Sequence, residues 1–216
     1  MTDTRPIGLA PGAAEEATGQ DAKKYSSTNP LVRTLIGRWL EAVTAAVGDD
    51  PGVHADLGVG EGLSLERVLP AGHRAVGLEY RFGKVAAARE RIPGLLPVVC
   101  DGGMVPVRDR MFDTVTCLEV LEHLDPFEPA VAELARITRG RCIVSVPYEP
   151  WFRLGNLGRG KNVTRIGNDP EHVQQFRQST LKRALGRHFD EVETRAVFPW
   201  IVAVARHTSS PRPGQN

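Results

Sequence analysis

The chain has 216 residues, of which 41% are hydrophobic and 25% charged, and its formal net charge is +1. These values are near the averages of soluble globular proteins, and the length fits one domain with short appendages. The small net charge provides no field that would draw the chain to nucleic acid or to an anionic membrane. Charge alone therefore leaves the class of partner open.

The three cysteines, Cys100, Cys117 and Cys142, are too few and too scattered for a metal cluster or a disulfide framework. Each lies in or at the end of an apolar run, where a free thiol behaves as a small buried hydrophobe. Residues 1–20 contain no apolar stretch of the signal-peptide type, and no window approaches the roughly 20 apolar residues of a membrane span. We therefore expect a cytoplasmic protein without a metal.

Composition divides the chain into one domain and two appendages. Residues 1–21 are rich in Ala, Gly, Pro, Thr and Glu without periodicity, which is typical of a mobile arm. Residues 207–216, with their Ser-Ser-Pro-Arg-Pro-Gly run, indicate a flexible tail. A single folded domain is expected between them, over residues 22–206.

Apolar spacing predicts helices and strands in alternation through most of this domain. The first helix begins at Asn29-Pro30, because a capping side chain is followed by proline at the first helical position. Strands are predicted at 53–57, 74–78, 95–100, 112–118 and 142–146, and helices at 63–69, 82–91 and 126–138. This alternation favours an α/β fold, a parallel sheet with right-handed crossovers.

The last part of the domain has a different pattern. A helix is predicted at 179–188 with Ser179 or Thr180 as its cap, followed by strands at 192–197 and 200–205. Only Phe198-Pro199 joins these strands, so they form an antiparallel hairpin. Residues 147–171 have no clear period, and a loop of that length in a compact domain is usually functional.

A glycine-rich segment, Asp56-Leu-Gly58-Val-Gly60-Glu-Gly62, follows the first predicted strand and opens a helix. Glycines let the backbone turn sharply and approach a ligand closely, at a helix N-terminus. A dinucleotide fingerprint needs glycines at the first, third and sixth places, but the sixth place here is Leu63. The spacing disfavours NAD, while a glycine turn without a ligand remains an alternative.

Acidic residues follow the second and third predicted strands. Glu79 ends the second strand, where a carboxylate can accept hydrogen bonds from both hydroxyls of a ribose; alternatively it pairs with Arg81 or Lys84 at the surface. Asp101, followed by Gly102-Gly103-Met104, can bind the amino group of an adenine while Met104 packs on its ring. Alone, Asp101 would be a turn former.

These motifs, together with Phe112-Asp-Thr-Val-Thr-Cys-Leu-Glu-Val-Leu-Glu-His-Leu124, resemble the class I S-adenosylmethionine (SAM)-dependent methyltransferases. The closest resemblance is to the subgroup of ubiquinone- and menaquinone-biosynthesis and natural-product enzymes. It runs from about Tyr25 to Arg206. The resemblance implies a Rossmann-like sheet of seven strands that ends in an antiparallel pair, with helices on both faces.

The resemblance also implies how SAM would be bound. Asp56 and the three glycines line its methionine end, Glu79 holds its ribose, and Asp101, Gly102 and Met104 flank its adenine. Leu118 and Glu119 end the fourth strand beside the sulfonium. Tyr25 either closes over the cofactor or anchors the first helix. The departure from the family is Tyr80-Arg81 after Glu79, where a small residue is common.

Methyl transfer depends mainly on alignment of the acceptor, which can contribute roughly 7–11 kcal/mol. A general base adds typically 10²–10⁴-fold. His123 and His172 are candidate bases, although a lone histidine is more often structural. In the 147–171 loop, Trp151, Phe152 and Arg153 are candidate acceptor contacts, and the loop is a candidate lid. Alternatively, its basic residues are solvated charges.

We therefore expect a SAM-dependent methyltransferase that modifies an O or N atom of a small acceptor, of the secondary-metabolite or quinone type, with C-methylation as an alternative. The chain lacks the Asn/Asp-Pro-Pro-Tyr of amide or adenine N-methyltransferases and the Pro-Cys nucleophile of cytosine C5 enzymes. We expect no nucleic-acid partner and no membrane span, in a monomer or homodimer. The alternatives are a SAM-binding regulator without catalysis and an NAD-dependent oxidoreductase.

Overall fold

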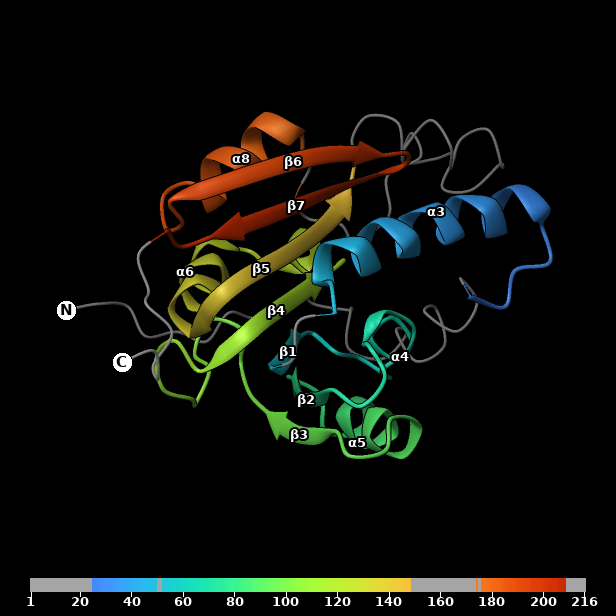
Figure 1. The fold of residues 1–216 in the computed structure, drawn as a ribbon, viewed down its shortest axis with the longest axis horizontal. Coiled ribbons are helices and arrows are strands. Elements are labelled where there is room, and N and C mark those ends of the chain that lie inside the picture. The colour runs from blue at the N-terminus through green and yellow to red at the C-terminus, as the bar shows by residue number, and fades with distance from the viewer. Residues whose placement is uncertain (1–24, 50–51, 149–173, 175, 209–216) are drawn as a thin grey trace.

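The computed structural model describes residues 25–49, 52–148, 174 and 176–208. Its centre is a seven-stranded sheet with the strand order β3-β2-β1-β4-β5-β7-β6 (Figure 1). The first five strands run parallel, and β7 is antiparallel to both of its neighbours. The strands are β1 Val53–Leu57, β2 Arg74–Glu79, β3 Leu96–Val99, β4 Phe112–Leu118, β5 Thr138–Pro147, β6 Glu191–Val197 and β7 Trp200–Arg206. The predicted fold class, including the antiparallel hairpin at the end, is confirmed.

The helices of the described part lie between these strands in the predicted order. They are α3 Pro30–Val47, α4 Leu65–Val68, α5 Phe82–Arg91, α6 Glu128–Ile137 and α8 Gln178–Leu185, with a 3-10 turn, η1, at Leu121–His123. Helix α3 begins as predicted, because Asn29 Oδ1 accepts the N–H groups of Leu31 and Val32. This side chain satisfies two donors that the first turn of a helix leaves unpaired.

The predicted cap of the last helix is wrong. Helix α8 follows Arg177, which is extended and makes no capping hydrogen bond with its side chain, and Ser179 and Thr180 lie inside the first turn. The helix is held instead by its apolar face, since Leu181 and Leu185 are fully buried. Packing against the sheet therefore fixes the start of this helix, as is usual when tertiary contacts outweigh local capping.

Helices cover both faces of the sheet, as predicted. On one face α6 and α8 pack on a core that includes Ala55 and Leu57 of β1. On the other face α3 packs through Trp39 and Val43, and α5 packs through a separate cluster. Successive side chains of a strand point to opposite faces. His54 and Asp56 of β1 therefore point to the face that α3 and α5 cover.

The order of the strands defines where a ligand would bind. From β1 the chain continues outward to β2 and β3, and then returns to β4 on the opposite side of β1. Open α/β sheets bind ligands at the carboxyl ends of the strands where the order reverses in this way. Apart from Tyr25, which precedes α3, the described residues predicted to bind the cofactor lie at this edge or in the segments that leave it.

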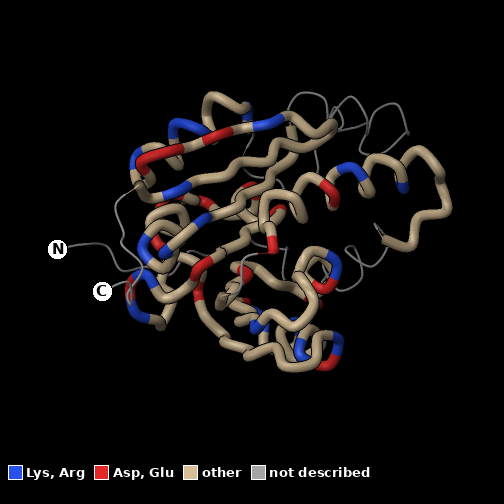
Figure 2. Tube along the Cα trace, viewed as in Figure 1, with Lys and Arg blue, Asp and Glu red and all other residues tan. Residues whose placement is uncertain are grey.

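The charges of the described residues do not collect on one element. Figure 2 shows Lys and Arg interspersed with Asp and Glu along the outer helices and β6, in keeping with the net charge of +1. In the described part of the chain, no helix has the length and apolar character needed to cross a membrane.

Candidate functional site

The glycine loop after β1 has a backbone that other residues would adopt with difficulty. Gly58, Gly60 and Gly62 have positive φ values of 78°, 55° and 78°. The loop is fastened to β2, because the N–H of Gly58 donates to the carbonyl oxygen of Leu78 at 2.7 Å. A Cβ on Gly58 would lie 2.4 Å from Cγ2 of Val120. The spacing of these glycines therefore reflects a turn that a side chain would disrupt.

Glu79 joins the end of β2 to the glycine loop. Its Oε2 accepts the N–H of Gly60 at 3.0 Å, and its Oε1 accepts the N–H of Arg81 at 3.0 Å. A carboxylate offers about four acceptor positions, so two remain after these contacts. The carboxylate can therefore hold the glycine loop and still accept hydrogen bonds from a ribose, which is the role predicted for it.

Asp101 lies at the end of β3 in a tight turn. Its Oδ1 accepts the N–H of Gly103 at 2.8 Å, and its backbone forms a bridge with Met104. Its Oδ2 is buried and has no hydrogen-bond partner among the described residues. A buried acceptor without a partner is costly. The amino group of an adenine would satisfy it. Met104 is 65% exposed, so its side chain is accessible to pack on a ring. A Cβ placed on Gly102 would lie 3.8 Å from Cδ1 of Leu57, which is ordinary van der Waals contact.

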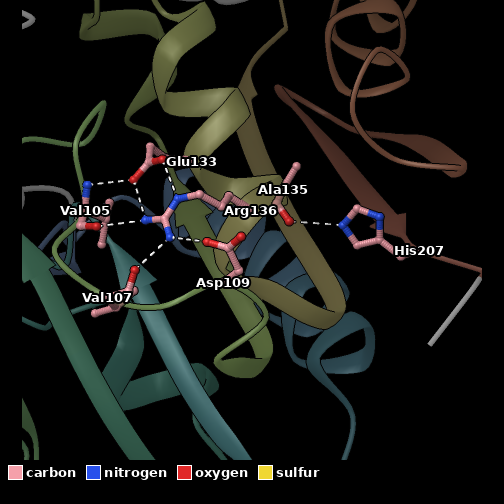
Figure 3. Close-up of polar contacts among 7 residues, drawn as sticks. All are labelled: Val105, Val107, Asp109, Glu133, Ala135, Arg136 and His207. Carbon is pink, nitrogen blue, oxygen red and sulfur yellow. Dashed lines mark hydrogen bonds and ion pairs between the residues drawn. The ribbon is translucent and has the colours of Figure 1, made fainter. Parts of the chain in front are cut away.

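The segment that follows this turn is held by two charged side chains of α6, which Figure 3 shows as sticks. Arg136 donates to the carbonyl oxygens of Val105 at 2.8 Å and Val107 at 2.7 Å, and to Asp109 at 2.7 Å. Glu133 accepts the N–H of Val105 at 2.7 Å and also pairs with Arg136. These contacts fix residues 105–109. They thereby support the adjoining Asp101–Met104 turn.

Asp56 ends a chain of three polar side chains in the middle of the sheet. The hydroxyl of Thr116 donates to Asp56 Oδ1 at 2.6 Å, and His54 Nε2 lies 2.9 Å from the same hydroxyl. Burial raises the pKa of Asp56 to about 7 and lowers that of His54 to about 4. We call these residues the His54–Thr116–Asp56 relay. The sequence analysis missed His54 and Thr116, although alternation from Asp56 along β1 would have placed His54 on the same face.

The end of β4 is held by two tryptophans from distant parts of the chain. Glu119 has a positive φ of 58° and donates its N–H to the carbonyl oxygen of Ser145 at 2.8 Å. Its side chain accepts a hydrogen bond from Nε1 of Trp200. Trp39 donates to Ser145 Oγ at 3.1 Å, and its ring lies 5.4 Å from that of Trp200. A positive φ outside glycine is uncommon and is enriched at functional sites. The neighbouring Leu118 is buried.

Tyr25 lies beside the helix that follows the glycine loop. Its hydroxyl is 2.7 Å from Ser64 Oγ, and the guanidinium of Arg67 lies 4.5 Å from the centre of its ring. Ser64 is two residues beyond Gly62, so Tyr25 is brought to the edge where the cofactor is expected. This position agrees with both predicted roles, closure and anchoring, and the choice between them stays a prediction.

The acceptor side of the site is only partly within the described residues. His123 ends the η1 turn and is half-buried, and its role as a base remains a prediction. His172, Trp151, Phe152 and Arg153 lie outside the described residues, as does most of the 147–171 loop.

The described residues contain no group of three His, Cys, Asp or Glu side chains placed to hold a metal ion. Cys117 and Cys142 are buried, as predicted, and Cys100 is half-buried. Burial raises the pKa of Cys100 to about 11 and that of Cys142 to about 12. These thiols are therefore protonated at neutral pH, and a thiolate nucleophile is not expected of them.

Comparison with known proteins agrees with this geometry. Residues 55–145 match the family model described as a methyltransferase domain. Demethylmenaquinone methyltransferase of Renibacterium salmoninarum is 31% identical over 135 residues, which cover 61% of this chain and 57% of the relative. The chain thus spans less than two thirds of the length of such relatives.

Solved structures share the fold at low sequence identity. Magnesium protoporphyrin IX methyltransferase from Synechocystis PCC 6803, with bound S-adenosylhomocysteine (SAH), has a TM-score of 0.65 and 19% identity, and the match covers 89% of this chain and 95% of that one. The [4+2]-cyclase SpnF has a TM-score of 0.61 at 14% identity, and the match covers 80% of this chain and 82% of that one. The chain has the class I SAM-dependent methyltransferase fold, and the resemblance predicted from its motifs is confirmed.

Proposed function

We propose that this chain is a SAM-dependent methyltransferase that acts on a quinone-like small molecule. One observation carries the proposal. Glu79 fastens the glycine loop to the end of β2, and the neighbouring Asp101 keeps a buried oxygen without a partner. A ligand that offers ribose hydroxyls and an adenine amino group would donate hydrogen bonds to the remaining acceptor positions of both carboxylates.

The residues of the sheet edge fit the parts of SAM one by one. Glycines let a backbone turn sharply and approach a ligand closely, so the loop of Gly58, Gly60 and Gly62 would line the methionine end with its backbone. Asp56 would face its amino group, Glu79 its ribose and Asp101 its adenine. When bound, SAM supplies an electrophilic methyl group on a sulfonium.

The protein's own contribution to transfer would be alignment and exclusion of water. Alignment can contribute roughly 7–11 kcal/mol, so a dedicated pair of catalytic residues is not required. Leu118 ends β4 and Glu119 follows it, beside the position predicted for the sulfonium. The hydrogen bond from Trp200 holds the Glu119 side chain in place. His123 follows on η1 and is the described candidate for a base.

The acceptor is proposed from the relatives. Those that match this chain are named demethylmenaquinone methyltransferases, which supports a quinone-like acceptor. The atom that is methylated stays part of the proposal, with an O or N atom predicted and a carbon atom as the alternative. The same holds for the cytoplasmic location, the lack of a nucleic-acid partner and the choice between monomer and homodimer.

Other activities on the same fold need a separate test. A cyclase among the structures that share the fold shows that the fold does not fix the reaction. A SAM-binding regulator without catalysis would have the same cofactor edge. An NAD-dependent oxidoreductase would require a different glycine spacing.

Calorimetry with SAM, SAH, NAD and NADP tests the cofactor. We expect SAM and SAH to bind and the nicotinamide cofactors not to bind. The purified chain is then incubated with SAM and demethylmenaquinone, and mass spectrometry measures the methylated product and SAH. Binding of SAM without any SAH formation would favour the regulator, and binding of NAD alone would overturn the assignment.

A further inference from the structure

The His54–Thr116–Asp56 relay is a buried polar chain within an apolar sheet. His54 and Asp56 lie on β1 and Thr116 on β4, and their exposed fractions are 1%, 3% and 0%. The neighbouring strand residues Ala55, Val115 and Cys117 belong to the apolar core on the opposite face. Burying three polar side chains is costly unless they are hydrogen-bonded. Their hydrogen bonds limit this cost, but the presence of polar residues at these three positions still needs an explanation.

The directions of the hydrogen bonds follow from the available protons. The hydroxyl of Thr116 carries one proton, and an ionised Asp56 can only accept. In the ionised state of Asp56, the bond of 2.6 Å to its Oδ1 therefore uses the Thr116 proton. His54 Nε2 must then donate to Thr116 Oγ1 across 2.9 Å. His54 is thus a neutral imidazole with its proton on Nε2, while Nδ1 is buried without a partner.

The relay ends at a residue of the proposed cofactor site. Asp56 immediately precedes Leu57 and the glycine loop, at the carboxyl end of β1. Thr116 occupies one oxygen of the carboxylate and leaves the other for a ligand. Since Thr116 is itself held by His54, the orientation of the carboxylate depends on a residue in the middle of the sheet.

We propose that His54 is a positioning residue for the cofactor, which acts through Thr116 to orient the Asp56 carboxylate toward the amino group of SAM. This inference rests on the proposed function and adds to it a residue that contacts neither cofactor nor acceptor. The alternative is that the three side chains only fill and stabilise the sheet.

The two explanations differ in the pH dependence of cofactor affinity. The positively charged amino group of SAM favours ionised Asp56, so affinity should rise as pH rises through the range in which Asp56 ionises. Burial and the charge of Glu79 on β2 oppose this ionisation, whereas the Thr116 bond favours it. Near the other end of the relay, His73 disfavours protonation of His54. Loss of the relay should therefore move the rise in affinity to higher pH.

The experiment measures the Kd of SAM by calorimetry between pH 6 and pH 7.5 for the whole chain and five variants, one of which is a control. We expect Thr116→Val to weaken binding about tenfold at pH 6.5, the order expected when a charged acceptor loses a hydrogen bond, and to move the rise in affinity to higher pH. His54→Leu should act in the same direction. Thr116→Ser and His54→Gln keep a hydroxyl and a side-chain N–H donor, so they should restore wild-type behaviour.

Thr114→Val is the matched control, because Thr114 lies on the same strand and face as Thr116 and pairs with His54 in register. Thermal unfolding of every variant measures the stability of the sheet separately. If Thr116→Val does not fold, the comparison of His54→Leu with His54→Gln decides the question.

The inference is overturned if Thr116→Val and His54→Leu bind SAM as tightly as Thr114→Val. It is also overturned if they lose affinity equally at every pH, which is what a purely structural role predicts. Failure of the wild-type chain to bind SAM at all would instead refute the proposed function.

Discussion

Gly58 and Val120 face each other across the carboxyl ends of β1 and β4, with no room for a side chain between them. A Cβ on Gly58 would lie 2.4 Å from Cγ2 and 3.1 Å from Cγ1 of Val120. Gly58, in the glycine loop, and Val120, which follows Glu119, are thus in direct contact. The cofactor end of the site is therefore coupled by packing to the segment where the acceptor is expected.

Gly58→Ala should destabilise the protein and weaken SAM binding. The clash costs about 1–3 kcal/mol as overpacking, and the positive φ of 78° adds strain. Thermal unfolding and calorimetry measure the two effects. Val120→Ala removes both clashing methyl groups, so the double variant should regain part of the lost stability. If Gly58→Ala lowers the free energy of unfolding equally in the wild-type and the Val120→Ala backgrounds, the proposed contact is contradicted.

Asp56→Asn should stabilise the cofactor-free protein at high pH and weaken SAM binding. Burial raises the pKa of Asp56 to about 7, so the folded state holds a proton that the unfolded state releases near pH 4. This contribution to stability falls as pH rises from about 4 to about 7. At pH 8 the wild type contains a buried carboxylate, and we expect the variant to be more stable by roughly 2–4 kcal/mol.

Denaturant unfolding at pH 5 and pH 8 checks this sign. His54 acts in the opposite direction, because its pKa is lowered to about 4 by burial and stability is lost as pH falls from about 6.5 through 4. Both proteins contain His54, so the difference between them isolates Asp56. The difference in free energy of unfolding between Asp56→Asn and the wild type should increase from pH 5 to pH 8. A difference that stays constant would contradict the prediction.

Glu79→Ala should weaken SAM binding by about 1.5–3 kcal/mol, the value of hydrogen bonds to a charged acceptor. The variant also releases the N–H of Gly60, so the glycine loop should become less ordered. Glu79→Gln keeps one oxygen acceptor and is expected to be intermediate. Glu90→Ala, an exposed acid on α5, is the matched control for calorimetry. Unchanged affinity of Glu79→Ala would restrict Glu79 to a structural role.

Arg136→Met should lower both stability and SAM affinity, because residues 105–109 lose their donor on α6. Loss of charged hydrogen bonds to Val105 and Val107 costs about 1–3 kcal/mol for a partly exposed guanidinium. Arg139→Met is a suitable control, since Arg139 pairs with Asp113 and has similar exposure. If both variants lose stability but neither loses SAM affinity, the Arg136 contacts do not support the Asp101–Met104 turn.

The parts of the fold that were predicted correctly depend on local patterns. Strand β4 and helix α5 have the predicted bounds, because their apolar periodicity begins and ends sharply. The cofactor edge was predictable because Asp56, Glu79 and Asp101 lie at or just beyond the carboxyl ends of β1, β2 and β3, and parallel strands bring these ends to one edge.

The parts that were not predicted depend on contacts between distant residues. Trp200 and Glu119 are 81 positions apart, and Arg136 reaches carbonyl oxygens 29 and 31 positions away. No local pattern indicates such pairs. Strand β5 begins at Thr138 instead of the predicted Cys142, because it continues beside β4 through polar residues that an apolar run does not mark.

The position of β7 has a consequence for the protein during its synthesis. Strand β7 is the last to leave the ribosome, yet it inserts between β5 and β6 and supplies Trp200 to Glu119. Until it arrives, the five parallel strands have β5 as an open edge that includes the apolar residues Ile143, Val144 and Val146. An unpaired apolar edge favours association between chains. A nascent chain that stalls before Trp200 can therefore aggregate through the edge of β5. Because Trp200 belongs to β7, the sheet is completed at the same time as Glu119 gains its hydrogen bond.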